Sequence, residues 1–277
     1  ACCYAIITIG LQTTLASGQF SVAHAALAGL GGYAAGVVSI ETGLPLPVAL
    51  VVGATVGLVA GAALAAVLRR TSGVLLGTVT IAVGQAVAIT MRNLDHVGPV
   101  ELGGSQGLAG IPPRTTLAWA VACLVLAVTG AELLGRSTVG LSVLAVGGDE
   151  TVARSLGVSV LATRLWGFAV GGALAGLGGA LIAHNNGIVE PKDLSFSAEP
   201  LFFIFLMIGG IGTPWGAVFG AFAVWWLQEL LRFPWSENGT FLFLDQQDRY
   251  WILGVLLVLV VLFRQKGVVL RRPIAAR

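Results

Sequence analysis

The sequence predicts an all-α fold: a polytopic transmembrane bundle of about nine spanning helices, forming one transmembrane domain over residues 1–277. The first observation is composition: 10% of the residues are charged, 56% are hydrophobic and the mean hydropathy is +0.92. Soluble domains carry about 25% charged residues. This chain therefore cannot cover a folded surface with polar groups, and its surface must face lipid. The net charge of +2 indicates no nucleic-acid partner.

The second observation is a series of apolar stretches, most of them near the length of about 20 residues that a helix needs to cross a bilayer. A barrel is excluded because stretches such as 115–135 are too long and do not alternate polar with apolar residues. The predicted helices are, in order, 2–16, 20–38, 47–68, 73–92, 115–135, 164–184, 199–212, 215–232 and 249–264. Because the first residue is Ala, we expect a further segment to precede it in the complete protein.

The third observation is the distribution of basic residues, which sets orientation because cytoplasmic loops are enriched in Lys and Arg. The tail should be cytoplasmic, since it holds Arg264, Lys266, Arg271, Arg272 and Arg277. Counting backwards places the first residue outside and segment 136–163 inside, together with Arg69 and Arg70. The loops expected outside are 39–46, 93–114, 187–198 and 233–248.

Glycines recur at spacings of four, which lets helix backbones approach closely in lipid. The pairs are Gly32/Gly36, Gly53/Gly57/Gly61, Gly172/Gly176 and Gly216/Gly220. They predict a tight bundle without indicating its function.

Several polar side chains fall inside predicted spans, where such groups usually face the bundle interior. The solute-path candidates are Gln19, Ser21, His24, Thr78, Thr80 and Gln85. Hydrogen bonding between helices is the favoured alternative for the Ser and Thr residues, and both interpretations stay open for His24 and Gln85. Glu132, Glu199 and Glu229 are expected near helix ends. A path without deep charges would suit a net-neutral, partly apolar solute.

The longest predicted cytoplasmic segment contains LSVLAVGGDETVARSLGVSVLATR, residues 141–164. Asp149 and Glu150 suit the first turn of a helix, and Gly157 suits its end. We therefore expect a helix of about two turns within 148–157. Glu150 and Arg154, four residues apart, would share one face and could pair.

Six motifs in a fixed order resemble the permease subunits of branched-chain amino acid ABC importers. They are GQFSVAHAALAGLGGYAAG (18–36), RRTSGVLLGTVTIAVGQ (69–85), GGSQGLAGIPP (103–113), GGDETVARSLGVSVLATRLWGFAVGGALAGLGGALIAH (147–184), GGIGTPWGAVFG (209–220) and LFRQKGVV (262–269). Two departures are Gln85, where the family often has an acidic residue, and Val152 beside Ala153, where it usually has paired alanines.

The resemblance implies a prokaryotic cell-membrane importer with a second, related permease, two ATPase subunits and an extracytoplasmic solute-binding protein. It implies that ATP is bound by the partners and that this chain holds no cofactor or metal. The ATPase-coupling residues would be Asp149, Glu150, Ala153, Arg154 and Gly157, with Ala153 permitting close approach. The solute would be a branched-chain amino acid or a small relative such as urea, an amide or an organic acid.

The sequence is consistent with ATP hydrolysis on a separate chain, because a phosphate-binding loop needs a Gly-Lys-Ser/Thr motif. Neither of the two lysines, Lys192 and Lys266, stands in that motif. An ion-coupled secondary transporter or channel is the alternative, since the short segments 199–212 and 215–232 fit a broken helix. An enzyme comes third: the sequence has no His-Glu-x-x-His motif, and His24, His96 and His184 are far apart.

Overall fold

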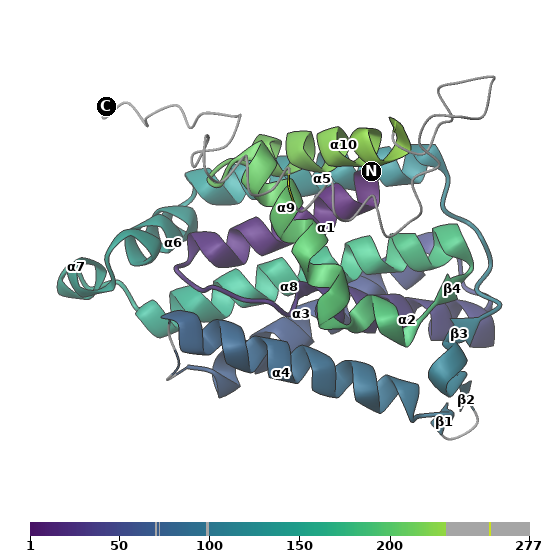
Figure 1. Cartoon of the computed structure of the whole chain (residues 1–277). Coiled ribbons are helices and arrows are strands. Elements are labelled where there is room, and N and C mark those ends of the chain that lie inside the picture. Colours follow the sequence, from purple (N-terminus) through teal and green to yellow (C-terminus); the bar gives the residue numbers. More distant parts are fainter. Residues whose placement is uncertain (70, 72, 98–99, 231–254, 256–277) are drawn as a thin grey trace.

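The computed structural model describes residues 1–69, 71, 73–97, 100–230 and 255. Most of these residues lie in helices that run alongside one another (Figure 1), so the all-α prediction is confirmed. The strands form two antiparallel pairs, and each strand is two residues long. The predicted span 249–264, the loop 233–248, Arg70 and the basic tail lie outside the described residues.

The α-helices are α1 (Cys2–Ala16), α2 (His24–Thr42), α3 (Leu46–Val67), α4 (Gly73–Arg92), α5 (Leu117–Arg136), α6 (Thr138–Gly148), α7 (Glu150–Ser155), α8 (Val160–Asn186), α9 (Glu199–Gly209) and α10 (Pro214–Leu230). Strands β1 (His96–Val97) and β2 (Val100–Glu101) pair, as do β3 (Leu108–Ala109) and β4 (Ile188–Val189). The short 3₁₀ helices are η1 (Gly104–Gln106), η2 (Pro191–Leu194) and η3 (Phe196–Ala198).

Helix bounds follow local signals. Helices α1 and α4 have the predicted limits, 2–16 and 73–92. Thr116 caps α5 by accepting from the backbone N–H of Trp119, and Ser159 caps α8 by accepting from Ala162. Helices α2 and α8 end at Gly43 and Gly187, both left-handed with φ of +64° and +74°.

Helix α8 is the central element, and glycines bring its neighbours into backbone contact. A methyl group added at Gly172 would overlap the carbonyl oxygen of Gly57, and one added at Gly176 would overlap that of Gly53. A methyl group added at Gly179 would overlap the backbone of Ala28 on α2, and one added at Gly10 of α1 would overlap the backbone of α8. The predicted tight packing is confirmed, and α1, α2 and α3 are locked to α8.

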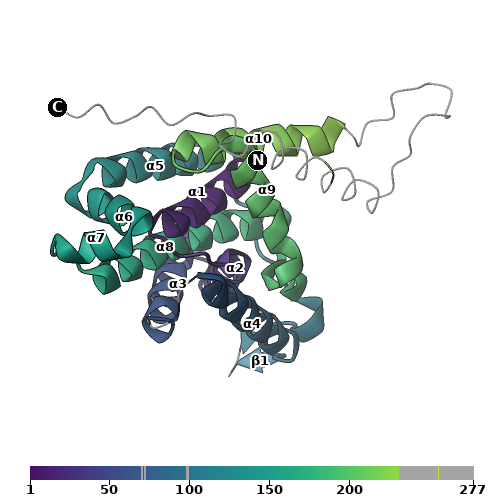
Figure 2. The ribbon, with the colours of Figure 1, turned by 60° about the vertical axis from the view of Figure 1, so that its left-hand side comes forward.

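Segments predicted on the same side of the membrane do gather at the same end of the bundle. At one end Arg114 Nη1 donates to the carbonyl of Leu44 (2.6 Å), and β3 pairs with β4. At the other end Gly18 lies against Gly147, near α6 and α7, which project from the bundle (Figures 1 and 2). The relative sidedness of these loops therefore agrees with the charge-based topology.

The nine spans are not confirmed. Five described helices are long and apolar enough to cross a membrane: α2, α3, α4, α5 and α8. Helix α1 has only 15 residues, and α9 and α10 form a pair bent by 114°, so that they count at most as one broken span. Length alone could not reveal the bend: the break at 210–213 holds Gly210 with φ +104° and Gly212 with φ +123°.

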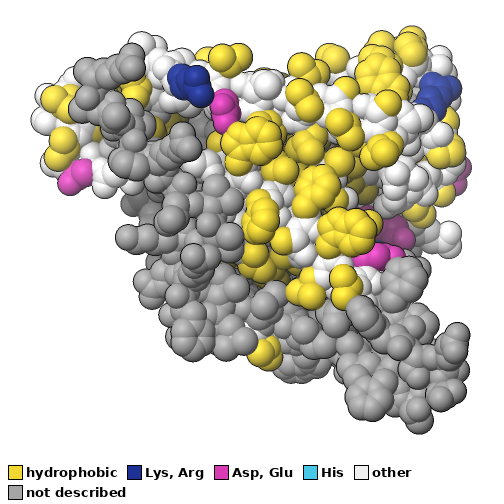
Figure 3. Space-filling view, turned by 90° about the horizontal axis from the view of Figure 1, so that it is seen from above, with side chains coloured by type: hydrophobic (Ala, Val, Ile, Leu, Met, Phe, Trp, Pro, Cys, Tyr) yellow, Lys and Arg dark blue, Asp and Glu magenta, His cyan; other side chains and the backbone are white. Residues whose placement is uncertain are grey.

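Figure 1 shows α9 crossing α1 and α10 returning alongside α5. The outer face of this pair is apolar and aromatic (Figure 3), with exposed Trp215, Phe219 and Trp226 on α10. Such a face suits lipid or another membrane helix.

Candidate functional site

The connection between α5 and α8 holds two helices where the sequence predicted one. Helix α7 is the expected coupling element, shortened to Glu150–Ser155. Helix α6, Thr138–Gly148, was missed, because segment 136–163 was treated as a loop carrying a single helix. The sequence does carry a signal for this helix, because Ser137, a favoured N-cap residue, directly precedes an apolar run. In the structure Ser137 Oγ accepts a hydrogen bond from the backbone N–H of Gly140 (3.2 Å).

Helix α7 is six residues long, too short to be stable alone, and its ends are fixed by the predicted residues. Asp149 Oδ1 accepts from the backbone N–H groups of Thr151 (2.8 Å) and Val152 (3.1 Å). Gly157 is left-handed, φ +80°, and lets the chain turn back toward α8. Asp149 and Gly157 therefore act as the sequence predicts, one at each end of the helix.

Ala153 does not lie where the sequence analysis put it. Its side chain is buried between Val146 of α6 and Val160 of α8, so it cannot approach a partner. The exposed apolar side chains of this segment are Val152 and Leu156. The missed signal is helical spacing: once Ala153 faces inward, Val152 and Leu156, four apart, share the outer face.

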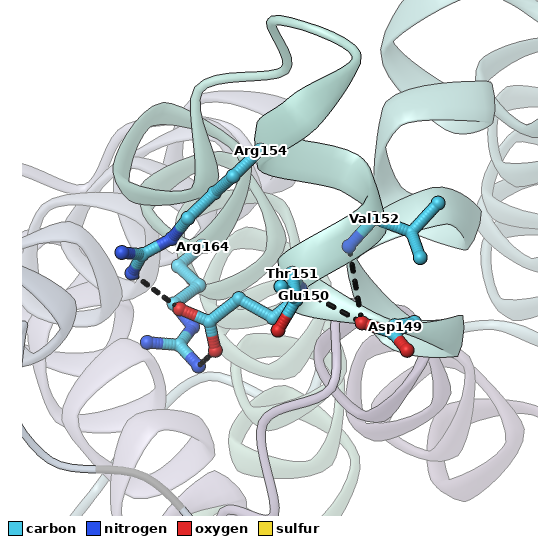
Figure 4. Close-up of polar contacts among 6 residues, drawn as sticks. All are labelled: Asp149, Glu150, Thr151, Val152, Arg154 and Arg164. Carbon is cyan, nitrogen blue, oxygen red and sulfur yellow. Dashed lines mark hydrogen bonds and ion pairs between the residues drawn. The ribbon is translucent and has the colours of Figure 1, made fainter.

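The predicted pair of Glu150 and Arg154 is present, with 2.5 Å between Oε1 and Nη2. Figure 4 shows a second arginine on the same carboxylate: Arg164 of α8 places its Nη2 2.8 Å from Oε2. Arg164 was not predicted as a site residue, since it is fourteen positions away. Glu150 thus forms one ion pair within α7 and a second one that links α7 to α8.

A second polar region lies in the middle of the bundle, where residues 17–23 are not helical. The segment leaves α1 near Gly147 and rises to His24, whose Nε2 is 3.1 Å from Thr14 Oγ1. His24 packs against Gly171, near the middle of α8. The helix predicted at 20–38 therefore starts at His24, beside the middle of α8. Irregular backbone at this depth needs internal partners.

Four of the six predicted path residues meet here, and all four are buried: Gln19, Ser21, His24 and Thr80. Thr80 Oγ1 accepts from the N–H of Val22 (3.0 Å), and Ser17 donates to Gln19 Oε1 (3.0 Å). Ser21 Oγ and His24 Nδ1 are buried without a partner among the described residues.

The other two, Thr78 and Gln85, lie elsewhere, on the exposed face of α4. They are seven residues apart and share that face. The structure therefore separates the candidates into a buried set at the break and an exposed polar stripe.

Glu199 corrects the expectation that no charge lies deep in the bundle. It begins α9, is 1% exposed, and its Oε1 accepts from the backbone N–H of Ala25 in the first turn of α2 (2.7 Å). The carboxylate thus caps a helix 174 residues away in sequence. Its Oε2 has no partner among the described residues. The hydropathy pattern predicts that Glu199 lies near a helix end, because it directly precedes an apolar run. It does begin α9, but η2 and η3 turn into the bundle before it, so this helix end is buried.

A cavity of about 600 Å³ lies between α1, α5, α6, α8 and the start of α10. Trp215 Nε1 donates to Glu132 Oε1 (2.7 Å) at its edge, and Gln12 faces it. None of the predicted path residues lines it, so it is not the predicted path.

Metal and serine chemistry find no support in the described part of the chain. No group of three potential metal ligands occurs there. His184 is held by Ser39 Oγ (2.7 Å) and the carbonyl of Ala180 (2.8 Å), a structural role. The stretch 103–107 matches Gly-x-Ser-x-Gly, but Ser105 lies on η1 and not on the strand-to-helix turn that a nucleophile requires.

Comparison with known proteins gave one matching family model, described as "Branched-chain amino acid transport system / permease component", over residues 1–262. Two similar proteins are the LivM permeases of high-affinity branched-chain amino acid transport from Salmonella typhimurium and Escherichia coli K12. Each is 24% identical over 98% of this chain and 68% of its own length.

A further relative is the LsrC permease of autoinducer 2 import from Enterobacter sp. 638. It is 29% identical over 78% of this chain and 65% of its own length. No solved structure gave a significant match.

Proposed function

Because the chain belongs to the branched-chain amino acid transport permease family, we propose that it is the permease subunit of an ABC importer in a bacterial inner membrane. It forms half of the path for a branched-chain amino acid or a similar small solute, and a second, related permease forms the other half. Separate chains supply two ATPase subunits, which bind the ATP, and a solute-binding protein. This chain performs no catalysis and holds no cofactor.

The observation that carries the proposal is the family match over residues 1–262. It is supported by a short helix, α7, at the position where the sequence predicts the coupling helix. Helix α7 projects from the end of the bundle that the charge distribution makes cytoplasmic (Figure 2). It offers exposed Val152, Arg154 and Leu156 to a partner. A short capped helix with an apolar and charged outer face suits a groove on a cytoplasmic ATPase.

The solute path is proposed along the exposed face of α4. Thr78 and Gln85 are polar and exposed within a helix that can span the membrane. Polar side chains facing lipid are costly, so they face a water-filled path or another protein chain. The second permease would complete the path across this face, and the buried set around His24 would hold the start of α2 behind it.

The most specific part of the proposal is the class of solute that is transported. Similarity to the LivM permeases extends over almost all of this chain and favours a branched-chain amino acid. Similarity to LsrC keeps autoinducer 2 as the nearest competitor.

An ion-coupled transporter or channel remains the second candidate because one observation favours it. Glu199 is a buried carboxyl group where the first turns of α2 and α9 meet, the kind of group that coupling ions use. The full-length family match outweighs it.

The test is purification of the tagged protein from its native cells in mild detergent, followed by reconstitution. Co-purified ATPase subunits and leucine uptake that requires ATP inside the vesicles are expected. Autoinducer 2 is the competing solute in the same assay. Uptake that follows a proton or sodium gradient without ATP would overturn the proposal and support the alternative.

A further inference from the structure

The two arginines on Glu150 differ in what they connect. Arg154 lies on the same short helix, four residues along, and its side chain is 65% exposed. Arg164 comes from the second turn of α8, and its side chain is 11% exposed. Each contacts a different carboxylate oxygen (Figure 4). Of the two ion pairs, only the one with Arg164 joins α7 to a membrane-spanning helix.

Without that contact, α7 is held loosely. It is bounded by Gly148 and Gly157, and a side chain added at either position would meet nothing within 4 Å. Its apolar attachment is a small cluster centred on Val146, Ala153 and Val160. Glycines at both ends leave the backbone there unrestrained by side-chain packing, so a directional, partly buried ion pair adds to this small cluster in fixing the orientation of the helix.

The other end of the link is rigid. Arg164 lies on the same helix as Gly172 and Gly176, which contact the backbone of α3, and Gly179, which contacts α2. A displacement of α8 must therefore carry its neighbours with it, because closely packed backbones cannot slide past one another without clashes.

We propose that Arg164 is a positioning residue for energy coupling: through Glu150 it makes α7 and α8 move as one body. The proposal rests on the proposed function, since it takes α7 to be the contact with the ATPase. It adds Arg164 to the coupling residues that the sequence analysis names. Arg154, by contrast, serves the outer surface.

The test compares Arg164→Met with Arg136→Met in the purified importer complex. Arg136 is a matched control, an arginine near the same end of the bundle that pairs with Glu132 at 3.5 Å and is 80% exposed. Three quantities are measured: ATPase subunits retained by the permease, basal ATP hydrolysis, and leucine uptake per ATP hydrolysed in the presence of the binding protein.

Arg164→Met should retain the ATPase subunits and lower uptake per ATP by about tenfold, the size of a typical coupling between sites. Arg136→Met should stay within about twofold of the unchanged protein, as expected for an exposed pair. Arg164→Lys should recover part of the loss, because lysine keeps the charge but not the planar fork.

Equal coupling in the two methionine variants overturns the proposal. So does loss of the ATPase subunits in parallel with activity, which would make Arg164 a docking or folding residue. If Arg164→Met fails to insert, Arg164→Lys carries the test: it must retain the ATPases and couple less well than Arg136→Met. Failure of the unchanged permease to retain any ATPase refutes the proposed function instead.

Discussion

Glu150 and Glu199 are carboxylates in the first turns of α7 and α9, and they are neutralised in opposite ways. Glu150 lies in the part of the molecule predicted to be cytoplasmic and contacts two arginines. Glu199 lies inside the bundle and contacts the backbone N–H of Ala25. Where water and long side chains are available, arginines bind the carboxylate; inside the bundle, a backbone N–H at the start of α2 binds the carboxyl group. The first arrangement leaves a surface for a partner, and the second fixes an internal break.

The largest expected effect is an all-or-none difference in access between the two ends. In a variant without Cys2, Cys3 and Cys123, a cysteine at Ser155 should react only from the cytoplasmic side. A cysteine at Ser105 should react only from outside. Both positions are exposed, at opposite ends of the bundle. A membrane-impermeant maleimide on intact cells measures this, and the reverse pattern would invert the whole comparison.

At the coupling end, Ala153→Trp should abolish retention of the ATPase subunits by disrupting α7 itself. Tryptophan cannot fit between Val146 and Val160, and overpacking of this kind costs about 1–3 kcal/mol. Leu156→Asp should also weaken retention but leave α7 intact, because Leu156 is exposed. Protease susceptibility near Gly157 separates the two: it should rise in the first variant only. A rise in both would mean that Leu156 is also structural.

At the internal break, Glu199→Ala should destabilise the permease by about 1–3 kcal/mol, the cost of leaving the buried N–H of Ala25 without its acceptor. Glu199→Gln keeps an acceptor for Ala25 and should lose less than half as much. Thermal unfolding in detergent provides the comparison. Equal losses would show that the charge itself, rather than the hydrogen bond, holds α2 in place.

The smallest expected effect concerns the two kinds of path candidate. Gln85→Leu, on the exposed face of α4, should lower leucine uptake or change solute preference by a few-fold, with stability within about 0.5 kcal/mol of the unchanged protein. His24→Leu should instead reduce stability, because it leaves buried Thr14 without its imidazole contact. Unchanged uptake and selectivity in Gln85→Leu would remove this residue from the path.

The sequence by itself determined where the helices long enough to span the membrane lie, and which end of the bundle most loops occupy. Helices α1 and α4 have their predicted limits, and Asp149 and Gly157 bound α7 as expected. These features depend on neighbours along the chain: apolar runs, caps and turn glycines act within a few residues. The distribution of lysine and arginine is likewise readable without a structure.

Only the tertiary structure decided which side chains meet. Glu199 reaches the start of α2 because η2 and η3 turn back into the bundle, and Arg164 reaches Glu150 because α7 folds against α8. Ala153 faces inward because Val146 and Val160 bury it, although its sequence context suited an outer contact. Because of the bend of 114° between α9 and α10, the two predicted spans count at most as one broken span. Contacts between residues far apart in sequence depend on how whole helices pack, and no local pattern of hydropathy or charge encodes that packing.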